Sequence, residues 1–167
     1  MAVEVILIYG QGGKSPLSAG FILFKNRLVS LGYNVADHFS WDRPDAVIKY
    51  IHDRRSKEQG LKIAGIGYSM GALAWSWIAS AGQRIELIAA YDPSAGFGPI
   101  FAAPPNPIGA NVKRCLCYVH TFPELFRIAP FTGNCEIIHT WAPHGLVQVN
   151  ERLHQITLRA LYDVEVT

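Results

Sequence analysis

Charged side chains are scarce in this sequence. Only 17% of its 167 residues are Asp, Glu, Lys or Arg, and their formal charges sum to +2. So small a net charge attracts nucleic-acid phosphates only weakly, and we expect no nucleic-acid partner. No apolar run approaches the roughly 20 residues of a membrane-spanning helix, so no membrane span is predicted. Glu4 interrupts the first apolar run and no basic segment precedes it, which argues against a signal peptide and for a cytoplasmic location.

Cysteine is equally rare, with three residues, Cys115, Cys117 and Cys135. Cys115 and Cys117 lie two positions apart on a predicted strand and share one face, where a disulfide between them would be strained. We therefore expect buried free thiols, as in a reducing compartment. No C-x-x-C or H-x-x-x-H spacing is present, so the sequence predicts no metal site, and nothing in it implies another cofactor.

Apolar residues make up half of the sequence, enough for a buried core, and we expect a single domain over residues 1–167. Val3–Tyr9 is a near-continuous apolar run rich in β-branched residues, which is typical of a strand buried on both faces of a parallel sheet. Further strands are expected at 33–41, 61–66, 85–91, 115–120 and 135–140, and helices at 17–31, 42–52, 72–79 and 146–161. This alternation predicts an α/β fold: a three-layer α/β/α sandwich around a mostly parallel six-stranded sheet.

One motif carries more chemical information than any other. Residues Gly67–Gly71 read G-x-S-x-G, with Ser69 at the centre, and they lie between the strand expected at 61–66 and the helix expected at 72–79. A serine at a tight strand-to-helix turn is the nucleophile elbow of serine hydrolases. The helix that follows would aim its free N–H groups and the positive end of its dipole at the serine. We interpret Ser69 as a nucleophile.

A serine hydroxyl is a weak nucleophile until a base removes its proton. His144 follows the last predicted strand in Ala142–Gly145, where it could reach back to the sheet edge. Its near-neutral titration suits it to accept and return a proton, and we predict it as the base. His139, within the last predicted strand, and His120, at the end of the preceding strand, are the alternatives.

The acid that orients such a base is predicted at Asp92, which ends an apolar strand. A carboxylate there is costly without a partner, and an imidazole N–H is a suitable one. Glu124, after the next strand, is the alternative acid; Asp42 and Asp45 are weaker candidates. An Asp before Pro93 could also simply form a turn.

An oxyanion hole needs two N–H donors. The residue after the nucleophile usually supplies one, which predicts the backbone of Met70. The glycine-rich loop after the first strand is expected to supply the other, from the backbone of Gln11. Gly10, Gly12 and Gly13 would let this loop approach a substrate closely.

With these motifs the sequence resembles the α/β-hydrolase superfamily of serine esterases and lipases. The chain order Ser69, Asp92, His144 is the order in that superfamily. Most members carry the acid after the strand two places beyond the nucleophile strand, whereas Asp92 follows the very next strand, as in pancreatic-lipase-type enzymes. The usual His-Gly of the oxyanion loop is Tyr9-Gly10 here. The resemblance implies a minimal α/β-hydrolase fold without a large cap domain.

The resemblance also implies hydrolysis of a small-molecule ester or thioester through an acyl-enzyme. Five phenylalanines of two loops could line an acyl pocket: Phe97, Phe101, Phe122, Phe126 and Phe131. One alternative is a catalytically inactive module that keeps the fold for binding or assembly. Another is a P-loop-like nucleotide-binding protein, because Gly12–Ser15 reads G-G-K-S between a strand and a helix. The P-loop pattern, however, needs a glycine at Ile8.

Overall fold

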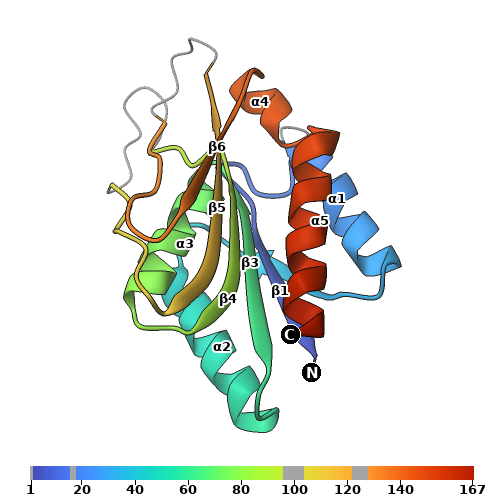
Figure 1. Cartoon of the computed structure of the whole chain (residues 1–167), viewed down its shortest axis with the longest axis vertical. Coiled ribbons are helices and arrows are strands. Elements are labelled where there is room, and N and C mark those ends of the chain that lie inside the picture. The colour runs from blue at the N-terminus through green and yellow to red at the C-terminus, as the bar shows by residue number, and fades with distance from the viewer. Residues whose placement is uncertain (1, 16–17, 96–103, 122–127) are drawn as a thin grey trace.

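Six parallel strands form the centre of the molecule (Figure 1). The computed structural model describes residues 2–15, 18–95, 104–121 and 128–167. The strands are β1 (Val3–Ile8), β2 (Asn34–Phe39), β3 (Lys62–Tyr68), β4 (Ile85–Tyr91), β5 (Val112–His120) and β6 (Glu136–Thr140). They lie in the order β2-β1-β3-β4-β5-β6, and all five neighbouring pairs are parallel. The predicted sheet is confirmed.

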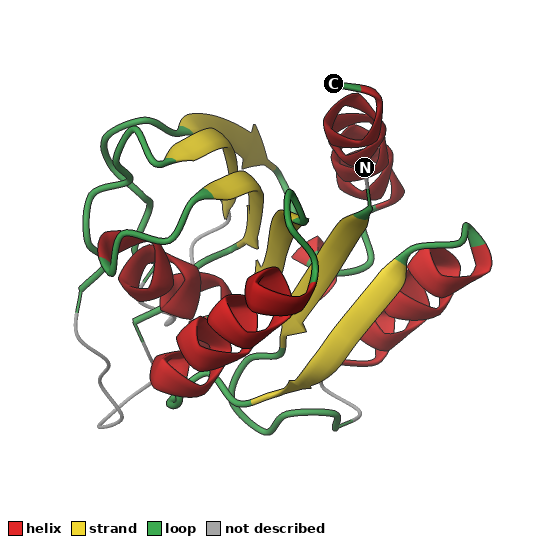
Figure 2. Ribbon diagram, turned by 90° about the horizontal axis from the view of Figure 1, so that it is seen from below, coloured by secondary structure: helices red, strands yellow, loops and turns green. Residues whose placement is uncertain are grey.

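Helices cover both faces of this sheet and complete the three layers (Figure 2). One apolar cluster joins the sheet to α1 (Ala19–Ser30) and α5 (Glu151–Val166), and the short α4 (His144–Val147) packs on the same side. A second cluster on the opposite face includes α2 (Pro44–Lys57) and α3 (Met70–Ser80). The predicted three-layer sandwich is therefore confirmed, and the described residues form no additional cap domain.

Burial explains why these runs become strands. Every residue of β1, β3 and β4 is buried, as expected for central strands that helices cover on both sides. The charged side chain that interrupts the first run, Glu4, is only 1% exposed and is neutralised by Arg54 of α2, whose Nε lies 2.6 Å from its carboxylate. A buried carboxylate needs such a partner, so Glu4 ties α2 to the sheet.

The closing helix differs from the prediction. The expected helix at 146–161 is in fact two helices, α4 and α5, because Asn150 interrupts it: its side chain accepts a hydrogen bond from Leu153 N–H and caps α5. The second helix of the chain, α2, is longer than expected and reaches Lys57.

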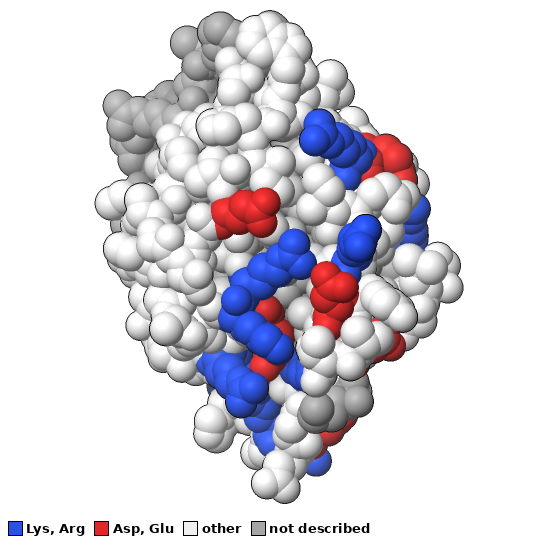
Figure 3. Space-filling view, in the orientation of Figure 1, with Lys and Arg blue, Asp and Glu red and all other residues white. Residues whose placement is uncertain are grey.

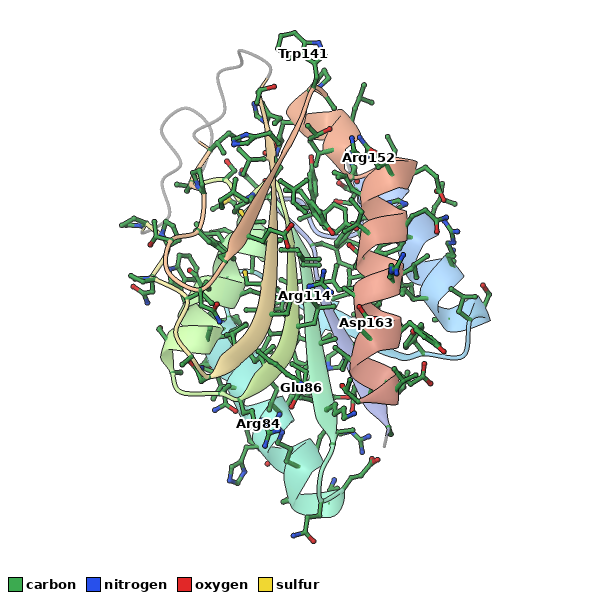
Figure 4. All side chains as sticks on the ribbon, in the orientation of Figure 1. Arg84, Glu86, Arg114, Trp141, Arg152 and Asp163 are labelled. Atoms are coloured by element: carbon green, nitrogen blue, oxygen red, sulfur yellow. The ribbon has the colours of Figure 1, made fainter. Side chains whose placement is uncertain are left out.

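Both basic and acidic residues lie on the face shown in Figure 3. Arg84 pairs with Glu86 and Arg114 pairs with Asp163, each at 3.3 Å, and Figure 4 shows the second pair near the middle of this face and the first pair below it. No helix within the described ranges is both long and apolar enough to cross a membrane. The three cysteines are free, as predicted; Cys115 and Cys117 are buried in one cluster, whereas Cys135, also expected to be buried, is only half-buried.

Candidate active site

The candidate residues gather at the carboxyl ends of the strands, near the end of the molecule that Trp141 and α4 mark (Figure 4). The strand order reverses between β1 and β3, because β2 lies on one side of β1 while the strands that follow β3 continue on the other. In open parallel sheets this switch point is the usual place for a binding site. The Gly10 loop follows β1 and Ser69 follows β3, so both flank the switch point.

Ser69 occupies the turn between β3 and α3 in a strained backbone conformation, with φ 58° and ψ −124°. The two glycines of the motif make this turn possible. An ideal Cβ on Gly67 would lie 2.4 Å from the carbonyl oxygen of Gly71, and one on Gly71 would lie 2.2 Å from that of Ile8. Since any larger residue would collide with backbone at either position, the motif is a steric requirement of the turn.

Ser69 and His144 are joined by a hydrogen bond. The Nε2 atom of His144 lies 3.0 Å from Oγ of Ser69, although the residues are 75 positions apart. His144 begins α4, is buried, and stacks on Tyr68 with ring centroids 5.1 Å apart. The Tyr68 hydroxyl also donates to the carbonyl oxygen of His144 at 3.3 Å. These contacts hold the imidazole beside a serine whose exposure is only 8%.

Asp92 lies behind His144 and is fully buried. Its Oδ2 is 2.5 Å from Nδ1 of His144, which extends the hydrogen-bonded chain from serine to imidazole to carboxylate. Because a carboxylate only accepts, Nδ1 of His144 carries the proton and Nε2 is left to accept from the serine. Asp92 therefore fixes the tautomer that a general base needs.

A second imidazole contacts the same carboxylate. Nδ1 of His120 lies 2.6 Å from Oδ2 of Asp92, and the backbone N–H of His120 donates to Oδ1 at 3.0 Å. From the sequence His120 is only an alternative base, and its contact with Asp92 was not predicted. The sequence indicates only that His120 ends a strand; that this strand, β5, lies next to β4 is a finding of the structure.

Asp92, His120 and His144 present donor atoms that all lie within 4.8 Å of one another, which raises the question of a metal site. Tetrahedral ligands bound about 2.0–2.1 Å from zinc are about 3.3 Å apart. The separations from Oδ2 of Asp92 to the two imidazoles are 2.6 and 2.5 Å. Such distances fit a shared proton better than a shared cation, so this arrangement is that of a hydrogen-bonded network.

Of the two predicted oxyanion donors, Met70 directly follows the serine, and Gln11 follows Gly10, which packs against it. Met70 is the first residue of α3, where helical geometry offers its N–H no intrahelical acceptor. Gly10 lies against the serine: a Cβ there would be 2.8 Å from Cβ of Ser69. Gln11 follows in a turn closed by Gly13 N–H and Gly10 C=O at 3.1 Å, and its part in an oxyanion hole stays a prediction.

The alternative candidates fare differently. His139 is exposed on β6, and the structure does not bring it to the serine. Glu124, the alternative acid, lies outside the described residues. The same is true of four of the proposed pocket phenylalanines, Phe97, Phe101, Phe122 and Phe126. Phe131 is described, and it is buried in the core cluster that includes α3.

A cavity of about 310 Å³ opens beside the Gly10 loop. Its walls come from the carboxyl ends of β1 and β2 and the segments that follow them: Tyr9, Gly10, Gly13, Lys14, Asp37, His38, Phe39, Ser40 and Trp41. Since Gly10 contacts Ser69, one wall of the cavity adjoins the nucleophile candidate. The phenylalanines predicted to line a pocket lie elsewhere, and the aromatic residues of this cavity, Tyr9, Phe39 and Trp41, were not predicted from the sequence.

No protein-family model matches this sequence, and a comparison with curated proteins finds no significant match. Solved structures do show the same fold. A proposed hydrolase of the α/β superfamily from Xanthomonas campestris pv. campestris is 15% identical with a TM-score of 0.62, over 96% of this chain and 99% of that one. An α/β serine hydrolase without lid, from Xanthomonas campestris, is 15% identical with a TM-score of 0.60, over 98% and 84% of the two chains.

Est1E from Butyrivibrio proteoclasticus, solved with ferulic acid bound, is 13% identical with a TM-score of 0.60, over 97% of this chain and 90% of that one. Identities this low establish a common fold rather than a common activity. The chain therefore has the fold of the α/β-hydrolase superfamily, as its resemblance to these enzymes predicted.

Proposed function

We propose that this protein is a serine hydrolase that cleaves carboxylic esters or thioesters through an acyl-enzyme intermediate. The observation that carries the proposal is the buried chain of hydrogen bonds from Ser69 through His144 to Asp92, with separations of 3.0 and 2.5 Å. The fold and the elbow geometry support the same conclusion.

In this mechanism Oγ of Ser69 attacks the carbonyl carbon of the substrate while Nε2 of His144 takes the hydroxyl proton. Asp92 stabilises the resulting imidazolium through Nδ1–H. The backbone N–H groups of Met70 and Gln11 donate hydrogen bonds to the negatively charged oxygen of the tetrahedral intermediate and stabilise it. When the intermediate collapses, His144 returns the proton to the leaving alcohol or thiol. Water then attacks the acyl-enzyme by the same steps and releases the carboxylic acid.

The substrate is a small molecule in this account. The cavity beside Gly10 has aromatic walls from Tyr9, Phe39 and Trp41, which would hold the part of the ester that does not react. Short acyl chains suit a volume of about 310 Å³. Est1E binds ferulic acid, so esters of aromatic carboxylic acids belong in a substrate series beside p-nitrophenyl acetate, butyrate and octanoate.

Hydrolysis of p-nitrophenyl esters tests the proposal directly. Ser69→Ala should lower kcat by about 10⁴-fold or more while the far-ultraviolet circular dichroism stays unchanged, since a member of the nucleophile–base unit is lost. Ser80→Ala is the matched control, because Ser80 is an exposed serine of the same helix, and it should keep the wild-type rate. Equal rates for the two variants would refute the assignment of Ser69.

The acid is tested separately. Asp92→Asn should also lower kcat by about 10⁴-fold, because the amide can donate to Nδ1 of His144 and so favours the wrong tautomer. Glu124→Gln should have little effect. If Asp92→Asn is harmless and Glu124→Gln is not, then Glu124 is the acid.

The two rival functions give different results. If the protein is a catalytically inactive module, the wild type should hydrolyse every ester no faster than Ser69→Ala does. Nucleotide binding would need Lys14 to face phosphates, but its Nζ lies 2.9 Å from the carboxylate of Asp37. Thermal stabilisation by a nucleotide, lost in Lys14→Ala, would favour that function over hydrolysis.

A further inference from the structure

Two histidines share one oxygen atom of Asp92. Nδ1 of His120 and Nδ1 of His144 lie 2.6 and 2.5 Å from Oδ2, and the two rings meet edge to face with centroids 6.1 Å apart. The side chains of His120, His144 and Asp92 are 3%, 4% and 0% exposed. In the folded protein, N–H groups therefore replace water as the hydrogen-bond donors to this carboxylate. The proposed mechanism uses only one of the two imidazoles.

The second imidazole has a definite task in this geometry. An unpaired buried carboxylate is unstable, and its orientation depends on the donors around it. His144 begins α4. His120 belongs to β5 and donates two hydrogen bonds to Asp92, one from its ring Nδ1–H and one from its backbone N–H. Since β5 pairs with β4 up to Tyr91, the residue before Asp92, His120 connects the carboxylate to the sheet.

We propose that His120 is a positioning residue of the active site. It holds the carboxylate of Asp92 against β5, and its hydrogen bond weakens the electrostatic attraction between this carboxylate and His144. The proposal rests on the proposed hydrolase function. His120 does not contact Ser69 in this arrangement, so it acts only through Asp92.

The sharing of Oδ2 has a consequence for pH dependence. The titratable groups around Asp92 are His120, His144, Tyr68 stacked on His144, and Cys117, whose pKa is raised in part by the charge of Asp92. A donor on Oδ2 weakens the pull of the carboxylate on a protonated His144. Without His120 the protonated, inactive form of His144 would be favoured, and activity would begin at higher pH.

Two substitutions separate the hydrogen bond from the volume of the ring. In His120→Asn the amide nitrogen stands two bonds from Cβ, as Nδ1 does, so a neutral donor is kept. In His120→Leu the donor is lost. His139→Asn is the control, because His139 is an exposed histidine on the neighbouring strand β6.

The expected result for ester hydrolysis is a graded one. His120→Leu should lower kcat by roughly 10- to 100-fold, because one hydrogen bond to a charged group is lost. It should also shift the acid limb of the pH profile of kcat/KM upward by roughly one pH unit. His120→Asn should keep most of the rate and the wild-type acid limb. Equal losses in both variants would assign His120 to packing, and wild-type behaviour of His120→Leu would overturn the proposal.

Proton NMR keeps this test independent of turnover. The structure predicts two hydrogen-bonded imidazole N–H protons at Asp92 in the wild type. His120→Leu should remove one of them and shift the other, that of His144, whereas His120→Asn should leave the His144 signal near its wild-type position. An unchanged His144 signal in His120→Leu would overturn the proposal. If the wild type hydrolyses no ester, the proposed function fails, and the NMR result still decides whether His120 shares the carboxylate.

Discussion

Ser69 and Asp92 both have a positive φ, 58° and 53°, which non-glycine residues seldom adopt, and no other non-glycine residue in the described ranges has one. The two residues follow neighbouring strands, and the N–H of Ser69 donates to the carbonyl oxygen of Tyr91, just before Asp92, at 2.9 Å. Strain of this kind persists where the surrounding structure enforces it, and it gathers at functional sites. Both strained residues belong to the candidate site.

The strain at Ser69 predicts a difference between two inactive variants. Ser69→Gly and Ser69→Ala both remove the hydroxyl, but glycine relaxes at this φ and ψ whereas alanine does not. We expect Ser69→Gly to be more stable by about 1 kcal/mol, which is roughly 2–4 °C in Tm. Thermal unfolding followed by circular dichroism measures this, and a higher Tm for Ser69→Ala would show that the turn is not strained.

Gly71 is predicted to tolerate no side chain. A Cβ there would lie 2.2 Å from the carbonyl oxygen of Ile8 and 2.4 Å from that of Tyr9, so Gly71→Ala should lower the free energy of unfolding by about 1–3 kcal/mol. Gly145→Ala is the control near His144, since nothing lies within 4 Å of its Cβ position. Chemical denaturation should place the midpoint of Gly71→Ala well below that of Gly145→Ala. Matching midpoints would contradict the close packing of the elbow on β1.

His154 of α5 should make the protein less stable in acid. The ring stacks on Phe24 at 4.1 Å between centroids and donates from Nε2 to the carbonyl oxygen of Gln148 at 2.8 Å. Burial lowers the pKa of His154 below its ordinary value. The unfolded chain therefore binds a proton more readily, and stability is lost as the pH falls below about 6.5, the unperturbed value.

The measurement is Tm against pH between pH 7.5 and 5.5. In His154→Phe, which keeps an aromatic ring on Phe24, the decrease in Tm on acidification should be smaller than in the wild type. His52→Gln changes an exposed histidine and should leave the decrease as it is. If His154→Phe shows the full wild-type decrease, the titration of His154 does not govern acid stability.

The cysteines are predicted to react slowly in the folded protein. The Sγ atoms of Cys135 and Cys115 are 2.7 Å apart. This contact raises the pKa of the Cys135 thiol, and a hydrogen bond with Cys135 together with burial raises that of Cys117. A protonated thiol is a poor nucleophile and Cys115 is buried, so iodoacetamide at pH 7.5 should modify the three residues only after unfolding in guanidinium chloride. Rapid modification of Cys135 in the native protein would contradict the described cluster.

The sheet could be predicted because its strands are short apolar runs separated by turn residues, and β4 was predicted at its observed bounds, Ile85–Tyr91. Asp92 could be singled out because a carboxylate at the end of such a strand needs a partner. The break between α4 and α5 was missed, although Asn150 is of a residue type that favours the N-cap position.

The contact of His120 with Asp92 could not be predicted from the sequence. It depends on the order of β4 and β5 in the sheet and on the direction in which one ring points, and neither is encoded in local periodicity. The cavity beside Gly10 was missed for a similar reason. Its aromatic walls lie at and just after the carboxyl ends of β1 and β2, which are neighbours in the sheet although they are separated in the sequence.

Covalent labelling with a fluorophosphonate probe tests the central claim most directly, because such a probe reacts with a serine only where a base and an oxyanion hole activate it. Intact-mass spectrometry of the wild type should show one adduct, peptide mapping should place it on Ser69, and Ser69→Ala and His144→Ala should not be labelled. A folded wild-type protein whose Ser69 stays unmodified would contradict the account.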